Sequence, residues 1–349
     1  MTVKGTDRRR TEFTRARAAS GFLLSGVVFM VARLLAEHSA RGFASSAWEP
    51  LIEQGMLAFL LLIGFAALGM MRDSQLDPVA QQGLAFRAGW RREAGLGVGL
   101  GWALALVCLL PMALGGMAVH FSVSLASFGW LVADGIFFAL ATLAVTIAFQ
   151  GYPLQALLRA IGEPSAALLM AILYGLMQMG LPGASRASMA MCFVFGLMLA
   201  IGYLRTRALW VPWGLHFGWV ASQALLFGLP VNGITSHSPV VQSYPMGSYF
   251  FSGGDFGLDG SWFAVLVMVA AMPVLFRATR DLSFVHNAPV IVPGGVAVDL
   301  DAAAKRQHEA ATRPEAPEVK PLVQILPAVP ATGSIAYPNP KGESGQGEE

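Results

Sequence analysis

The chain has 349 residues, of which 55% are hydrophobic and 13% are charged, and its mean hydropathy is +0.58. Soluble domains carry about a quarter charged residues, and their surface helices need a polar face. The net charge of +2 and the lack of an aromatic–basic patch give no support for nucleic-acid binding. Cys108 and Cys192 lie in apolar segments without metal-ligand spacing. Composition therefore excludes an ordinary soluble protein and predicts an integral membrane protein in contact with lipids.

Eight segments combine the length and the apolarity of transmembrane helices, which need about 20 residues to cross a bilayer. The predicted fold is therefore all-α, a polytopic membrane bundle of about eight transmembrane helices. The basic start followed by an apolar run resembles a signal peptide, but Arg33 interrupts that run and no small-residue cleavage site follows, which favours an uncleaved first helix. The predicted segments are 21–36, 55–71, 95–119, 128–150 or longer, 164–180, 188–204, 209–229 and 262–275.

Lys and Arg alternate between connections in a way that predicts the orientation. The N-terminal segment and the second, fourth and sixth connections carry most of them, whereas the odd-numbered connections hold Arg41 and Arg186. Short loops rich in Lys and Arg stay in the cytoplasm. We therefore expect a multi-pass protein of a bacterial-type inner (plasma) membrane with both termini cytoplasmic. The predicted parts are a basic N-terminus (1–19), a transmembrane domain (20–280) and a Pro-, Ala- and Glu-rich tail (281–349) that should be disordered.

Glycines alternate along the start of the third segment, at Gly95, Gly97, Gly99 and Gly101. A nucleotide-binding loop would need a preceding strand and a following acidic residue, and neither is present. Small residues four apart instead allow two membrane helices to approach closely. The run therefore predicts a tight helix–helix contact.

Polar side chains inside the predicted spans are costly, about 2.5–3.5 kcal/mol for a central charge, so each requires a partner or a role. Arg33 lies near a span end and can extend to the interface, and Asp134 lies deeper, where a structural hydrogen-bond partner is expected. Thr146 and Gln178 are equally far in sequence from the Gly162 turn. If the fourth helix continues past Pro153, these two side chains share one depth.

His216 also lies well inside its span, so one buried cluster of Thr146, Gln178 and His216 is predicted. A polar packing network and a functional site are both consistent with such a cluster.

The segment 149–233 resembles the CAAX-protease and bacteriocin-processing (CPBP, or Abi) family of intramembrane metalloproteases, with a core at about 128–233. Three blocks, in the family's order and spacing, carry the resemblance. They are Phe149-Gln-Gly-Tyr with Leu154-Gln-Ala-Leu-Leu, Tyr174-Gly-Leu-Met-Gln, and Leu204-Arg-Thr-Arg with Leu209-Trp-Val-Pro and Gly214-Leu-His.

The resemblance implies hydrolysis of a peptide bond within the membrane, by water activated between a first-block glutamate, two histidines and an Asn or Asp, with or without a metal. This sequence retains one of these groups, the third-block histidine, as His216. The motif positions that have changed are Val145 and Thr146 for the paired glutamates, Gln150 for the arginine, Gln178 for the second-block histidine and Val220 for the Asn or Asp.

The site residues carried over from the family are thus His216, Gln178 and Thr146, and two of the three do not titrate near neutral pH. The sequence favours a non-catalytic member that binds a transmembrane or lipidated peptide in the old cavity. An active endopeptidase with an unorthodox site is the alternative, and a small-molecule or lipid transporter is the second. No cofactor is predicted, and zinc or another divalent metal belongs here only if the family mechanism survives.

Overall fold

The computed structural model describes residues 3–43, 45, 47–72, 79, 82–181, 183–235, 238, 240–282 and 308–309. The chain divides into a unit of residues 1–313 and a short unit of 314–349, and all that follows concerns the first. The predicted disordered tail, 281–349, lies outside the described residues except for 281–282 and 308–309.

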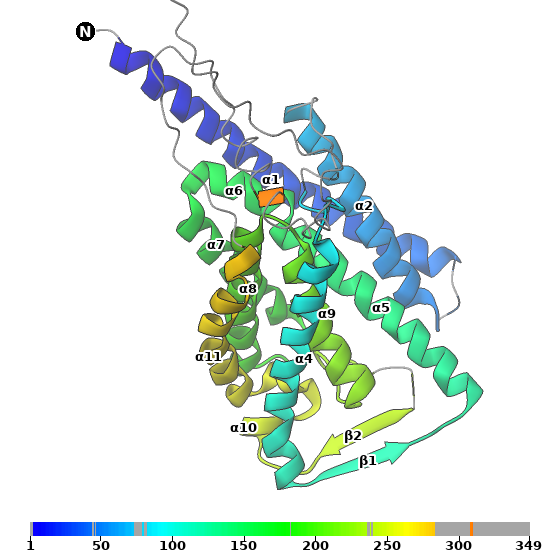
Figure 1. Cartoon of the computed structure of the whole chain (residues 1–349). Coiled ribbons are helices and arrows are strands. Elements are labelled where there is room, and N and C mark those ends of the chain that lie inside the picture. The colour runs from blue at the N-terminus through cyan, green and yellow to red at the C-terminus, as the bar shows by residue number, and fades with distance from the viewer. Residues whose placement is uncertain are drawn as a thin grey trace, which may run out of the picture. The chain divides into compact units, whose positions relative to one another are not determined.

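The first unit is a bundle of helices (Figure 1), which confirms the predicted all-α membrane fold. Five helical stretches of the described residues are long and apolar enough to cross a membrane, and α7, α9 and α11 are shorter. The long ones are α1 (Val3–Phe43), α2 (Glu49–Arg72), α4 (Trp90–Gly115), α5 (Leu125–Gln150) and α8 (Arg186–Thr206). The shorter ones are α7 (Glu163–Leu176), α9 (Trp210–Ala221, extended by a π-helical turn Ser222–Leu226) and α11 (Trp262–Ala278).

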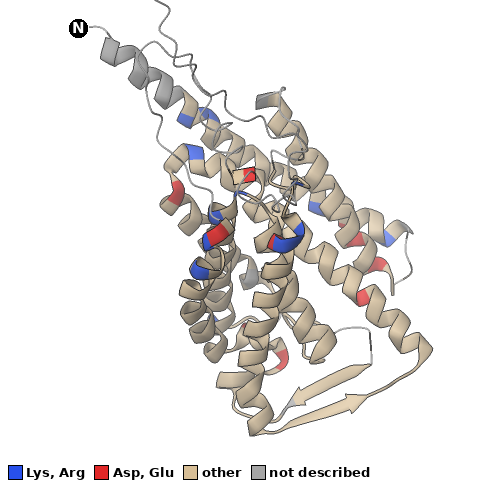
Figure 2. Cartoon of the chain, viewed as in Figure 1, with Lys and Arg blue, Asp and Glu red and all other residues tan. Residues whose placement is uncertain are grey.

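Large apolar side chains cover both the interior and much of the outer surface. Trp219, Met191 and Leu215 are buried in the core around α8 and α9, whereas Leu23 and Leu266 are more than half exposed. Most of the described Lys and Arg residues gather at the end of the bundle where α4 begins and where α8 and α11 end (Figure 2). An apolar outer surface with charge at one end is the pattern expected of a protein solvated by lipid.

The glycines of α4 make the closest contact in the bundle. A Cβ atom on Gly97 would lie 2.4 Å from the Val211 carbonyl oxygen, and one on Gly101 would lie 2.4 Å from that of Leu215. Gly214 and Gly218 of α9 face α4 equally closely, whereas Gly95 and Gly99 have nothing within 4 Å. The predicted small-residue contact is therefore confirmed for two of the four glycines. It fixes α9, the helix that carries His216, against α4.

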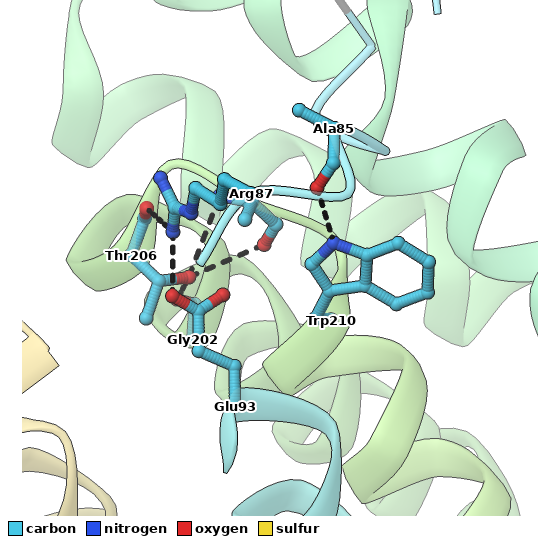
Figure 3. Close-up of polar contacts among 7 residues, drawn as sticks. Ala85, Arg87, Glu93, Gly202, Thr206 and Trp210 are labelled. Carbon is cyan, nitrogen blue, oxygen red and sulfur yellow. Dashed lines mark hydrogen bonds and ion pairs between the residues drawn. The ribbon is translucent and has the colours of Figure 1, made fainter. Parts of the chain in front are cut away.

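A loop before α4 holds the start of α9 (Figure 3). The Leu209 amide donates to the Gly83 carbonyl and the Trp210 Nε1 donates to that of Ala85, both at 2.9 Å. The Arg87 guanidinium donates to the Thr206 carbonyl at 3.1 Å and to the buried Glu93 carboxylate at 2.6 Å. The turn between α8 and α9 is thus attached to α4 at this end as well.

The end of the third predicted span differs from the prediction. The third predicted span, 95–119, ends as a helix at Gly115, and residues Met117–Phe121 form β1 instead. This strand pairs antiparallel with β2 (Val241–Pro245), with Met117 opposite Pro245. The loop after α9 thereby folds back onto the end of α4, and it also contains the short helix α10 (Tyr249–Ser252).

The predicted continuation of the fourth helix past Pro153 is wrong. The α5 helix ends at Gln150, Gly151 is non-helical, and a separate helix α6 (Tyr152–Ile161) begins with Pro153 in its first turn. Proline has no amide hydrogen, so it fits the first turn of a helix and not its interior. A depth measured from Gly162 along one continuous helix therefore does not apply to Thr146.

Candidate functional site: a cavity between α1, α2, α5 and α9

A cavity of about 290 Å³ lies among the helices, and three of the positions at which the resemblance implies catalytic groups border it. Val145 of α5 and His216 and Val220 of α9 are part of its wall. Apolar side chains make up most of the remainder: Phe29, Leu57, Phe137, Phe138, Ala141, Ala144, Phe149, Met177, Leu181, Val231 and Ile234. The positions that the family uses for a carboxylate and for an Asn or Asp here contribute valine methyl groups.

His216 is held between aromatic rings. Its Nε2 lies 3.3 Å from the Tyr174 hydroxyl, and the ring of Phe195 meets the imidazole edge-on at 5.4 Å between centroids. The side chain is buried, and Nδ1 has no hydrogen-bond partner among the described residues. One imidazole nitrogen therefore retains unused hydrogen-bonding capacity within the wall of the cavity.

Thr146 forms its hydrogen bond within its own helix. It is fully buried, its hydroxyl donates to the Thr142 carbonyl at 2.7 Å, and it is not among the residues that border the cavity. The cluster of Thr146, Gln178 and His216 therefore stays a prediction. Gln178 belongs to the 3₁₀ turn Met177–Gly180, and its side chain lies outside the described residues.

Tyr174 is the partner that sequence reasoning missed. It opens the Tyr174-Gly-Leu-Met-Gln178 block, one helical turn before Gln178, so the block itself marked it. Its hydroxyl reaches His216 across the contact between α7 and α9. Because the side chain is large and amphipathic, it can pack in the core and still donate a hydrogen bond.

Four polar residues that are exposed or half-buried also line the cavity: Arg33 of α1, Glu53 and Gln54 of α2, and Asn232 of the loop after α9. Glu53 lies just before the apolar stretch predicted as the second span, so its place beside the cavity could not be foreseen. With these four residues, here called the polar rim, the cavity combines an apolar wall with one cation and one carboxylate.

Asp134 has a structural role, as predicted. It accepts a hydrogen bond of 2.8 Å from the Ser238 amide, and the Ser238 hydroxyl donates to the Ser127 carbonyl at 3.2 Å. These bonds join α5 to the loop that follows α9. The carboxylate is not among the residues that border the cavity.

A comparison with protein families matches residues 127–222 to the family described as type II CAAX prenyl endopeptidase Rce1-like. The chain contains an Rce1-like domain. This finding confirms the resemblance drawn from the three sequence blocks, and together with the apolar helices it identifies a membrane protein. No curated protein and no solved structure matches the chain significantly.

The Rce1-like domain extends from α5 into the π-helical turn after α9. It therefore contains Val145, Tyr174, His216 and Val220, but not Arg33 or Glu53. Most of the apolar wall belongs to the Rce1-like domain, and the two charged residues of the polar rim, Arg33 and Glu53, come from α1 and α2.

The donor set of the Rce1-like domain does not fit a catalytic metal. Among the residues that the structure describes, no three His, Cys, Asp or Glu side chains lie close enough to hold an ion together. A catalytic zinc requires three protein ligands and an open position. His216 offers one metal ligand, its imidazole, and the valines at positions 145 and 220 offer no ligand.

Proposed function

We propose that this protein is a non-catalytic Rce1-like protein that binds a lipidated or transmembrane peptide segment in the cavity. The observation that carries the proposal is the joint placement of Val145, His216 and Val220 on one cavity wall. Two positions that would supply polar groups for hydrolysis supply apolar surface instead. Apolar side chains at these positions remove the need to solvate buried charges.

Binding in such a cavity depends on shape and on polar contacts. An apolar chain that leaves lipid for an apolar cavity gains little from the hydrophobic effect, because both surroundings are apolar. Selectivity therefore comes from packing against Phe137, Phe138 and Phe149 and from polar contacts with the polar rim. A farnesyl chain joined to a short peptide can make both kinds of contact. The farnesyl chain would pack against the rings, and the peptide would lie at Glu53, Arg33 and Asn232.

The test is photo-crosslinking of a farnesylated peptide to the purified full-length protein in nanodiscs. Ala141→Trp, which places an indole in the cavity, should reduce crosslinking at least tenfold. Ile136→Trp, on the lipid-exposed side of the same helix, should leave it unchanged. The His216→Ala variant should retain binding, and mass spectrometry should recover the peptide intact. Equal crosslinking in the Ala141 and Ile136 variants would show that the peptide binds elsewhere.

An active endopeptidase is the second candidate, and Glu53 is the observation that favours it. A carboxylate from α2 and the His216 imidazole border the same cavity. In such a reaction the carboxylate would take a proton from the attacking water, and the imidazole would protonate the departing amine. Hydrolysis of the farnesylated peptide that is lost in both Glu53→Gln and His216→Ala would establish this candidate and overturn the first.

The orientation belongs to the same proposal. We place the Arg-rich end of the bundle and both termini in the cytoplasm of a cell with a bacterial-type inner membrane. The clustering of Lys and Arg where α4 begins and α11 ends supports this placement. Cysteines introduced one at a time at Ser122 and Arg92 should react with an impermeant thiol reagent from the outside and the inside, respectively. The reverse pattern would invert the topology.

A further inference from the structure

Three arginines surround a shallow groove at the end of α8 and α11, away from the cavity that contains His216. Arg205 lies in the last turn of α8, Arg277 in the last turn of α11, and Arg280 just beyond it. The groove has a volume of about 590 Å³, and Met272, Pro273 and Phe276 complete its lining. This volume is within the range of pockets that bind small organic ligands, about 300–1,000 Å³.

The contacts of Arg205 orient its guanidinium without neutralising it. Its Nε donates to the Thr279 hydroxyl and its Nη2 to the Phe276 carbonyl, both at 3.2 Å. The guanidinium carbon also lies 5.4 Å from the centre of the Phe276 ring. All of these partners are uncharged, so the positive charge of a pre-positioned guanidinium remains available to a ligand.

The balance of charge around the groove is positive. Within the described part of the chain, neither Arg205 nor Arg277 pairs with a carboxylate, whereas the neighbouring Arg207 pairs with Glu163 and Arg87 with Glu93. Arg205 and Arg277 therefore bring two positive charges to the groove that no carboxylate of the described residues neutralises, and Asp281, which follows Arg280, is exposed. A ligand that fits must carry negative charge.

One side of the groove continues into an apolar surface. Pro273 and Phe276 are exposed at the groove, and Leu266 and Val269 continue the exposed apolar surface along α11. The site thus combines a cationic end with an apolar strip that runs along a membrane helix. A soluble phosphate compound would bind the cationic end and make no use of the apolar strip.

We propose that this groove binds the phosphodiester headgroup of an anionic phospholipid, whose acyl chains lie along α11. Guanidiniums bind phosphate oxygens through paired N–H donors, which gives geometric specificity as well as attraction. Basic pockets between membrane helices are a recurrent form of anionic headgroup site. The proposal does not depend on what binds in the cavity beside His216.

The experiment compares lipids on the full-length protein in neutral detergent. Native mass spectrometry and thermal unfolding are followed during titration with phosphatidylglycerol and, separately, with phosphatidylcholine. Phosphatidylglycerol should bind saturably and raise the unfolding temperature, and phosphatidylcholine should do neither. The Arg205→Gln/Arg277→Gln double variant should bind phosphatidylglycerol at least tenfold more weakly. Unchanged binding would overturn the proposal.

Matched controls separate a specific site from general attraction to positive charge. Arg186 lies at the opposite end of α8, so Arg186→Gln removes the same charge elsewhere and should leave binding unchanged. Arg277→Gln alone should weaken phosphatidylglycerol binding without changing stability, because the Arg277 side chain has no hydrogen bond within the described structure. This single variant remains informative if the double variant unfolds. Glycerol phosphate without acyl chains should not compete. Equal loss in the Arg186 variant, or full competition by glycerol phosphate, would refute a phospholipid site.

Discussion

Gly97 of α4 and Gly214 of α9 pack backbone against backbone, so closely that a Cβ atom on Gly97 would lie 3.0 Å from the carbonyl carbon of Gly214. We expect Gly97→Leu to separate the two helices and to lower the stability of the protein by about 1–3 kcal/mol or more, the usual cost of overpacking. Thermal unfolding in detergent, followed by tryptophan fluorescence, measures the change. Gly99→Leu is the matched control, because nothing lies within 4 Å of that position. Equal losses in the two variants would contradict the role of the contact.

The pair of Arg87 and Glu93 gives a second prediction. Glu93 is fully buried and its Oε1 accepts the Arg87 hydrogen bond at 2.6 Å. Arg87→Met should leave a buried carboxylate without its partner and destabilise the protein by about 3–5 kcal/mol. The double variant Arg87→Met/Glu93→Leu should recover most of that loss, because an apolar pair does not need solvation. Chemical or thermal unfolding tests both variants, and a double variant as unstable as the single one would show that Arg87 acts mainly through Thr206.

Asp259 predicts a dependence of stability on pH. It lies between α10 and α11, outside the long helices, and accepts a hydrogen bond of 2.8 Å from the Trp219 Nε1. Burial raises the pKa of the Asp259 carboxyl to about 6, against the opposing effect of the Trp219 bond. The folded state therefore holds a proton that the unfolded chain releases near pH 4, and stability falls as the pH rises from about 4 to about 6.

Asp259→Asn keeps an acceptor for Trp219 and removes the charge. The variant should match the original protein at pH 4 and exceed its stability by about 3 kcal/mol at pH 8, since each unit of pKa shift is worth about 1.4 kcal/mol. Unfolding temperatures of both proteins across this range provide the measurement. A constant difference at every pH would mean that the carboxyl does not titrate in this way.

The cavity wall predicts that a metal site can be built. His216 and position 220 are four residues apart on α9, the spacing at which two histidines share one helix face and bind zinc. Val220→His with Val145→Glu should add two ligands to the existing imidazole and complete a three-ligand site. Cobalt should then bind with the visible absorption of tetrahedral coordination. The original protein, and the same double variant with His216→Ala, should lack that signal.

The helices were predictable because hydropathy reports the contact of each segment with lipid. The same averaging concealed the ends of the elements. Val119 extended the apolar run beyond Gly115, although the chain leaves the helix there to form β1. Hydropathy stays high across Gly151, so the break between α5 and α6 leaves its mark in the local residues Gly151 and Pro153 and not in the average.

The cavity was less predictable, because it depends on contacts between helices distant in sequence. The motif blocks singled out His216, which borders the cavity, but which neighbour reaches its imidazole depends on how α7 packs on α9. The glycines show the same limit. Residues two apart on a helix face different sides of it. Gly97 and Gly101 make the contact because α9 lies on their side of α4, and Gly95 and Gly99 face away from it.

The cavity is built partly from the Rce1-like domain and partly from chain outside it. Val145 and His216 belong to that domain at 127–222, whereas Arg33 and Glu53 come from α1 and α2. The charged part of the lining and the part beside His216 are therefore encoded in different stretches of sequence. A chimera that receives its first two helices from a different protein with an Rce1-like domain should change ligand selectivity while the wall around His216 stays intact, so the two parts can be modified independently.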